Sequence, residues 1–308
     1  RYPIVILNIY VNINMKNILF IFFQYITPQK LLSHLAGCVA EFTAPWFKKR
    51  LIHWFIERYN VDMSIAKNSA PDSYQHFNDF FTRPLAEGQR PIDKAKNSIV
   101  CPADGCISQL GKIKHGRIFQ AKGQEYSLQE LIGGSDTLAA PFKNGQFTTV
   151  YLSPKDYHRV HMPVAGTLTQ MLHVPGDLFS VNETTANNVP RLFARNERVV
   201  CLFETELGPM AVILVGAMIV ASIEVPWAGL ITPVKKQVRS WNYPSINSSA
   251  ADHNSFAPVH LEKGEEMGRF KLGSTAIVLF GDNVMVWDPN LAAQSPVIMG
   301  QAMGQVMG

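Results

Sequence analysis

Two histidines three residues apart stand out as groups that could do chemistry. They are His158 and His161, in the segment DYHRVHMP (residues 156–163), with an arginine between them. As a metal pair they lack a third ligand at a convincing spacing, because His173 and Asp177 are only generic candidates, so we expect no metal. Histidines beside acid, phenol and guanidinium groups fit general acid-base catalysis about as well as they fit a structural role.

Two further segments carry groups that could work with a histidine. Asp104 lies in CPADG (residues 101–105), where Asp-Gly is also an ordinary hairpin turn. Ser274 follows Gly273 before an apolar stretch, where a plain turn is the simpler interpretation. With no Cβ on Gly273, however, the Ser274 hydroxyl can approach the Gly273 carbonyl, and a strained peptide bond there could rearrange by an N-to-O acyl shift. Asp104, a histidine and Ser274 would then resemble a protease triad that acts on its own chain.

Composition and the absence of other motifs narrow the function classes. The 308 residues are 47% hydrophobic and 17% charged, which excludes a disordered chain and a protein with many membrane spans. The net charge is 28 − 24 = +4, with no basic stripe, so we expect no nucleic acid as a partner, although a slightly basic surface suits anionic lipid. No dinucleotide fingerprint, phosphate-binding loop, hydrolase elbow or zinc-protease motif occurs. Four cysteines without C-x-x-C spacing indicate reduced thiols.

The N-terminal residues predict membrane association without a span. Residues 4–26 are largely apolar, but asparagines and Lys16 interrupt them too often for a comfortable transmembrane helix. Met15 looks like a bacterial start, so we expect residues 1–14 to be upstream read-through or disordered. The lipoprotein-like box ending at Cys38 is rejected, because polar residues separate it from the apolar run.

Two amphipathic helices are predicted over residues 29–59, with a break at Pro45. Leu31, Leu35 and Val39 share one helical face, and Trp46 precedes a run of three basic residues. Such helices either lie in a lipid interface or pack on the domain, and the pattern does not decide between the two.

The rest of the chain predicts a sheet-rich domain. Short β-branched runs occur at residues 147–152, 199–204, 210–215, 218–223 and 275–280. Residues 240–256, rich in Asn, Ser and Pro, predict a surface loop. We therefore expect an α+β protein: a helical, membrane-associating region over residues 15–70, followed by a catalytic domain over residues 71–308.

Read together, these segments resemble the bacterial phosphatidylserine decarboxylases. The resemblance rests on KLGST (271–275), DYHRVHMP and PADG (102–105), and it extends from about Met15 to about Phe280. It also covers three longer stretches: QAKGQEYSL (120–128), VPGDLFSVN (174–182) and NVPRLFARNERVV (188–200).

The resemblance implies a self-processing proenzyme with a covalent pyruvoyl cofactor and no pyridoxal phosphate or metal. The bond between Gly273 and Ser274 would be cut, which leaves a β chain ending at Gly273 and an α chain of 308 − 273 = 35 residues. Asp104, His161 and Ser274 match the processing triad, Ser274 becomes the pyruvoyl group that forms the Schiff base, and His158 matches the decarboxylation acid or base.

It also implies partners and a location. The substrate would be phosphatidylserine, and the protein would be a homodimer held peripherally on the anionic, cytoplasmic face of the inner membrane. An apolar pocket formed by Phe179 and its neighbour Ser180 would strip water from the substrate carboxylate.

Three rival interpretations remain open. A serine hydrolase would use Ser274, His161 and Asp104 on an external ester and stay uncut. A structural membrane protein would be indifferent to the loss of Ser274. A pyruvoyl enzyme for a related amine-bearing acid would act on free serine as well as on lipid.

Overall fold

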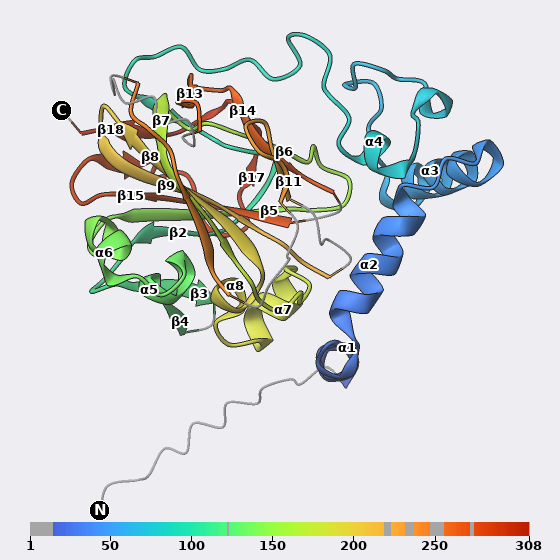
Figure 1. The fold of residues 1–308 in the computed structure, drawn as a ribbon, viewed down its shortest axis with the longest axis horizontal. Coiled ribbons are helices and arrows are strands. Elements are labelled where there is room, and N and C mark those ends of the chain that lie inside the picture. The colour runs from blue at the N-terminus through green and yellow to red at the C-terminus, as the bar shows by residue number, and fades with distance from the viewer. Residues whose placement is uncertain are drawn as a thin grey trace, which may run out of the picture.

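Helices come first in the chain and sheets make up most of the remainder (Figure 1). The computed structural model describes residues 15–121, 123–218, 223–231, 237–246, 256–271 and 274–307. The predicted α+β class is confirmed, whereas the prediction for residues 1–14 lies outside the described residues. The first helical elements are α1 (Met15–Ile26), α2 (Gln29–Ala40), α3 (Pro45–Tyr59), the short 3₁₀ helix η1 (Pro71–Ser73) and α4 (Phe77–Phe81).

The two helices predicted over residues 29–59 are present. Pro45 occupies the first turn of α3, where a missing N–H is tolerated, and Asn60 ends the helix in the left-handed region at φ 54°. Ile52 and Phe55 of α3 are buried against the aromatic residues of α4. This small aromatic core fixes α4, and with it the residues that follow.

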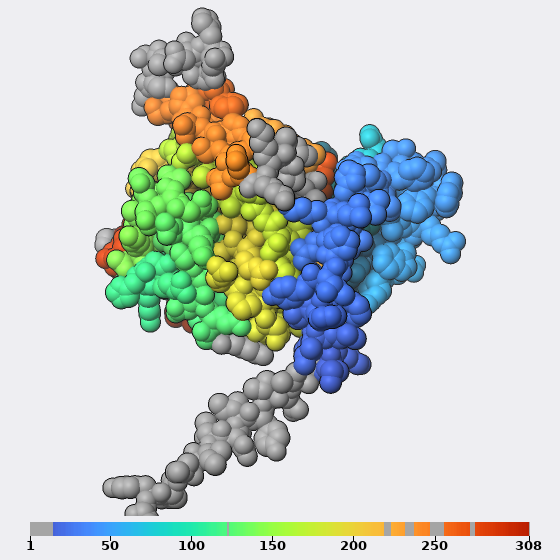
Figure 2. Space-filling model, turned by 60° about the horizontal axis from the view of Figure 1, so that its bottom comes forward, coloured from blue at the N-terminus to red at the C-terminus, as the bar shows by residue number. Residues whose placement is uncertain are grey.

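Helices α1 and α2 are amphipathic, but they bury polar side chains and expose apolar ones. Gln24 and Ser33 are 2% and 1% exposed, whereas Phe22, Phe23 and Leu35 are 51–55% exposed. The Gln24 Oε1 atom accepts a hydrogen bond from the Ser180 N–H at 2.8 Å, so the polar face of α1 binds the sheet domain. Figure 2 shows these helices along one side of the molecule. None of the helices in the described ranges is long and apolar enough to cross a membrane.

One large antiparallel sheet forms the centre of the catalytic domain, in the order β12-β7-β8-β9-β15-β5-β2-β17, with β13 also paired to β7. Strands β9 and β15 lie in its middle and are buried on both faces, which explains their unbroken apolar sequences. Its strands are β2 (Gly105–Lys112), β5 (Gln146–Leu152), β7 (Gly166–Val174), β8 (Arg198–Thr205), β9 (Gly208–Val215), β12 (Arg239–Asn242), β13 (His260–Leu261), β15 (Ser274–Phe280) and β17 (Pro296–Val297).

Smaller elements cover the two faces of this sheet. A second sheet runs β11-β10-β14-β6, a third runs β1-β18-β16, and β3 pairs with β4. A second apolar core includes residues of α5 to α8 and of the β3-β4 hairpin. The strands are β1 (Ser98–Val100), β3 (Arg117–Ala121), β4 (Gln124–Ser127), β6 (Arg159–His161), β10 (Ile223–Val225), β11 (Gly229–Ile231), β14 (Glu266–Phe270), β16 (Met285–Trp287) and β18 (Ala302–Val306). The helices are α5 (Leu128–Ile132), α6 (Asp136–Ala139), η2 (Ala140–Phe142), α7 (Glu183–Asn188) and α8 (Leu192–Arg195).

Two sequence expectations need correction or stay untested. The loop predicted from Ser240 is wrong for residues 240–242, because their backbone pairs with the edge of β7 and Trp241 packs on the main core. Of the strand predicted over 218–223, residues 219–222 lie outside the described residues, and β10 begins at Ile223.

Candidate active site

The turn between β5 and β6 presents the two predicted histidines. Asp156 accepts hydrogen bonds from both the N–H and the hydroxyl of Ser153, each at 2.7 Å. Burial raises the pKa of Asp156, and these hydrogen bonds oppose the rise. This closed turn delivers Tyr157 and His158 into the interior, and β6 follows with His161.

His161 is held as a neutral base. Its Nδ1 atom lies 2.8 Å from the carbonyl oxygen of Gly264, and because a carbonyl only accepts, Nδ1 carries the hydrogen. Nε2 therefore carries the lone pair, which accepts a hydrogen bond from the Tyr157 hydroxyl at 3.2 Å. Burial lowers the pKa of His161. The tautomer and the charge state both suit proton abstraction at Nε2.

Asp104 is buried close to His161 without a hydrogen bond to it among the described residues. Its carboxylate accepts from the guanidinium of Arg90, with Nε at 2.8 and 3.0 Å from the two oxygens, and from the Met299 N–H at 2.9 Å. The His161 N–H donates to the Pro102 carbonyl at 2.8 Å, which ties β6 to the CPADG segment. Asp104 thus acts on His161 through its charge, and Gly264 orients the ring.

His158 is completely buried and unusual in its surroundings. Its ring stacks on Phe81 with centroids 3.9 Å apart, and among the described residues no partner lies in good hydrogen-bond geometry with either ring nitrogen, although the backbone of Ser153 and Pro154 is close enough to oppose the fall in its pKa. Burial, with the positive charge of Arg83 as the next cause, lowers the pKa of His158 to about 3. In this state the ring is neutral, and an anion placed beside it would raise its pKa.

Ser274 is the first residue of β15. Its backbone pairs with Leu152 at the end of β5, and Phe270, which ends β14, donates its N–H to the His158 carbonyl at 3.0 Å. The predicted cut lies between these anchors, although Gly273 itself is outside the part of the chain that the structure describes. The backbone on both sides of the predicted cut is therefore held by the segment that carries the histidines.

A cavity of about 530 Å³ opens beside the same turn. Ser153, Lys155 and Asp156 line it on one side, and residues 181–183, where α7 begins, on another. The predicted substrate contacts Phe179 and Ser180 bind α1 and α7 instead: Phe179 packs on Tyr25, and the Ser180 hydroxyl lies 2.7 Å from that of Thr185. None of the contacts found for this pair among the described residues is to His158 or His161.

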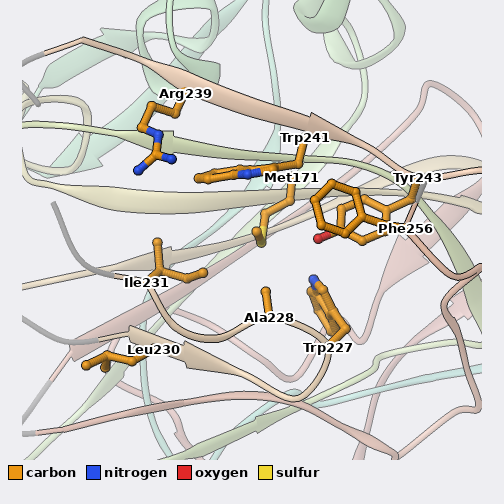
Figure 3. A pocket seen from close by; sticks show the side chains of 9 residues that line it. All are labelled: Met171, Trp227, Ala228, Leu230, Ile231, Arg239, Trp241, Tyr243 and Phe256. Atoms are coloured by element: carbon orange, nitrogen blue, oxygen red, sulfur yellow. The ribbon is translucent and has the colours of Figure 1, made fainter. Parts of the chain in front are cut away.

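A second cavity, of about 300 Å³, has an aromatic lining (Figure 3). Trp227, Trp241, Tyr243 and Phe256 form much of it, with the guanidinium of Arg239 5.0 Å from the Trp241 ring. None of its lining residues is a predicted site residue. Within the described ranges, no group of three or more His, Cys, Asp or Glu side chains is arranged to hold a metal ion.

Three residues of the site were given no role from the sequence. Tyr157 lies inside the DYHRVHMP segment, next to His158 and four residues before His161, so the sequence could have indicated a role for it in the site. Arg90 and Arg83 lie in a polar stretch between the helical and sheet regions, where no spacing marks them. Only the folded chain brings them to Asp104 and His158.

Comparisons with known proteins agree on one family. The family model described as phosphatidylserine decarboxylase matches residues 77–305, and a second model described as PSD matches residues 19–60. Relatives described as phosphatidylserine decarboxylase proenzyme include those of Pseudomonas putida strain GB-1, 61% identical over 94% of this chain and 99% of the relative, and Pseudomonas entomophila strain L48, 62% identical over 94% and 98%. The relative from Ectopseudomonas mendocina strain ymp is 61% identical over 94% and 99%.

Proposed function

The chain belongs to the phosphatidylserine decarboxylase family, and from this premise we propose that its centre forms where β15 begins, by self-cleavage between Gly273 and Ser274. The resemblance seen in the motifs is thereby confirmed. The protein is a decarboxylase proenzyme that converts phosphatidylserine into phosphatidylethanolamine and CO₂. The observation that carries the proposed centre is the neutral His161, whose Nδ1–H is held by Gly264, on the strand that follows the turn after Leu152, the backbone partner of Ser274.

Cleavage starts with a proton transfer. Nε2 of His161 takes the hydroxyl proton of Ser274, and the oxygen attacks the carbonyl carbon of Gly273. The acyl group moves from nitrogen to oxygen, which leaves an ester in place of the peptide bond. The ester then breaks by elimination: Cα of residue 274 loses its proton and Gly273 leaves as a carboxylate. The dehydroalanine that remains takes up water and releases ammonia, which gives the ketone. Asp104 stabilises the imidazolium that forms through its charge, and Arg90 keeps that carboxylate in place.

The neighbours of Ser274 along β15 and across on β5, Thr275 and Leu152, are buried, which suits a pyruvoyl group made from Ser274. A ketone at that chain terminus supplies the electron sink for the carbanion that remains when CO₂ departs. His158 follows β5, whose last residue pairs with Ser274, and its ring nitrogens have no side-chain partner in the described ranges, so it can hold a proton for the carbanion. When an anionic headgroup enters, its charge raises the pKa of His158 and favours the protonated ring.

Intact mass spectrometry of the purified chain tests this function, combined with CO₂ release from phosphatidylserine vesicles. We expect two fragments separated at Gly273, the smaller of 35 residues with a ketone-blocked N-terminus, because residues 274–308 form the α chain. Free serine should give no CO₂. An uncut chain with esterase activity would instead support the hydrolase interpretation.

We also propose that α1 to α3 bind the anionic surface of the membrane, peripherally and on its cytoplasmic face. Outward apolar side chains support the binding: Leu35, Trp46 and Trp54 are 53%, 72% and 53% exposed, beside basic residues of α3. The cytoplasmic face and a homodimer are supported by the family resemblance.

The variant Leu35→Asp/Trp46→Asp is expected to bind anionic vesicles about 100-fold more weakly. Each outward side chain contributes about 1.5 kcal/mol or more when it enters lipid, and each new carboxylate is repelled by the surface. Vesicle sedimentation measures the change. Val286→Asp, an equally outward position on β16, is the control and should bind normally; equal loss in both variants would contradict the proposed surface.

A further inference from the structure

Arg83 is a buried cation with unused hydrogen-bond donors. Its side chain is 1% exposed, and its Nε and Nη1 atoms have no hydrogen-bond partner within the part of the chain that the structure describes. Nη2 makes one long contact, 3.3 Å to the Lys155 carbonyl oxygen, and the guanidinium lies 5.4 Å from the centre of the Phe80 ring. A charge removed from water in this way is costly unless a partner completes it.

The acidic side chains around Arg83 are already occupied. Asp62, Asp104 and Asp156 are near enough to act on its charge, yet none is within ion-pair distance of it among the described residues. Each accepts hydrogen bonds elsewhere: Asp62 from Ser64, Asp104 from Arg90 and Met299, and Asp156 from Ser153. The protein therefore surrounds this guanidinium with weak negative potential and leaves its donors open.

A second buried arginine shows how the same fold satisfies such a group when its role is structural. Arg198 is 2% exposed, and its guanidinium donates to four backbone carbonyl oxygens, those of Glu130, Leu131, Ala194 and Asn196. Arg198 fastens α5 and α8 to the start of β8. Arg83 has no comparable set of carbonyls, so a merely structural role does not explain its burial.

The open donors lie at the predicted centre. Arg83 follows α4, whose Phe81 ring stacks on His158, and the carbonyl that Arg83 contacts belongs to the turn before His158. The neighbouring side chain of Lys155 lines the 530 Å³ cavity. Arg83 and His158 are buried behind this lining, so a headgroup that enters from the cavity reaches them past the turn of residues 153–156.

We propose that Arg83 binds an anionic oxygen of the phosphatidylserine headgroup, an inference that rests on the proposed function. The fork of N–H donors matches a phosphate or a carboxylate. The reaction itself favours the phosphodiester over the carboxylate as the group that Arg83 binds. When the bond from Cα to the carboxylate breaks, its electron pair stays on Cα and CO₂ leaves uncharged. A cation fixed on that carboxylate would stabilise the substrate more than the transition state, whereas the phosphodiester keeps its charge throughout.

The test compares Arg83→Met, Arg83→Lys and Arg198→Met in the cut enzyme. Arg83→Met should raise KM for phosphatidylserine in mixed micelles about tenfold or more, because a charge-assisted contact is lost, and Arg83→Lys should recover part of it. The melting temperature of Arg83→Met should stay close to that of the wild type, since an unpaired buried charge is removed. Arg198→Met should melt lower by about 5 °C or more, because four carbonyls lose their donor.

Inhibition by phosphatidylethanolamine distinguishes the two oxyanions. Weaker inhibition of Arg83→Met assigns Arg83 to the phosphodiester, and unchanged inhibition with a raised KM assigns it to the carboxylate. An unchanged KM and unchanged inhibition overturn the proposal, as does a fall in melting temperature equal to that of Arg198→Met. If Arg83→Met stays uncut, lipid binding is compared between uncut Ser274→Ala chains with and without Arg83→Met, where equal affinity overturns it. The fragment masses of the wild type test the cut independently of Arg83.

Discussion

Ser274→Ala is expected to leave the chain uncut and to abolish decarboxylation. The variant lacks the hydroxyl that must attack Gly273, and without that oxygen no ester can form whose elimination would lead to the ketone, so no slower route to the cofactor remains. The loss is therefore complete rather than partial. Intact mass spectrometry shows it directly, because the fragment of residues 274–308 should be absent.

The matched control for this variant is Thr148→Ala. Thr148 lies on β5, which pairs with β15, and its buried hydroxyl has no partner among the described residues, but it stands opposite Val278, away from the predicted cut. We expect this variant to be cut and active. Cleavage of Ser274→Ala at the same bond would show that another group supplies the nucleophile.

The second large effect separates the two histidines. His161→Asn should slow cleavage about 10²- to 10⁴-fold, the usual contribution of a general base, and the Asn side-chain amide can still donate to Gly264. His158→Asn should be cut normally and then turn over phosphatidylserine more slowly by a similar factor. Cleavage is followed by fragment mass over time, and turnover by CO₂ release per cut chain.

The role of His161 as a base also predicts that cleavage slows in acid. His161 acts only when neutral, and burial lowers its pKa from the usual 6.5, so cleavage should keep more than half of its maximal rate down to pH 6.5. Well below the pKa of His161 the rate should fall about tenfold per pH unit, as the imidazole becomes protonated. A rate that reaches half of its maximum above pH 6.5 would contradict a buried base.

Much of this fold follows from local pattern, because buried strands and amphipathic helices mark themselves in sequence. The unbroken apolar runs of β9 and β15 predicted strands, and the period of Leu31, Leu35 and Val39 predicted a helix. The faces of α1 and α2 that point inward were not predictable. The partner that binds α1 at Gln24 is Ser180, 156 residues away, and no local pattern encodes it.

The candidate site also combines residues that local sequence predicts with partners that it does not. His158 and His161 share one segment, so their proximity was readable, and Tyr157 between Asp156 and His158 was a signal without an assigned role. The carbonyl that fixes the tautomer of His161 is 103 residues away, at Gly264. Backbone partners of this kind carry no side-chain signature, so the sequence predicted Asp104 as the orienting group where the fold uses Gly264.

The central place of β15 has a consequence for the lifetime of the mature enzyme. β15 pairs with both β5 and β9, while β17 pairs with β2 and β18 with β1, so the 35-residue fragment is interwoven with the larger one. It folds as part of one continuous polypeptide but, once cut, could return only by a bimolecular encounter. Denaturation of the cut protein should be irreversible at low concentration, and its working half-life is then set by the rate of unfolding rather than by an equilibrium.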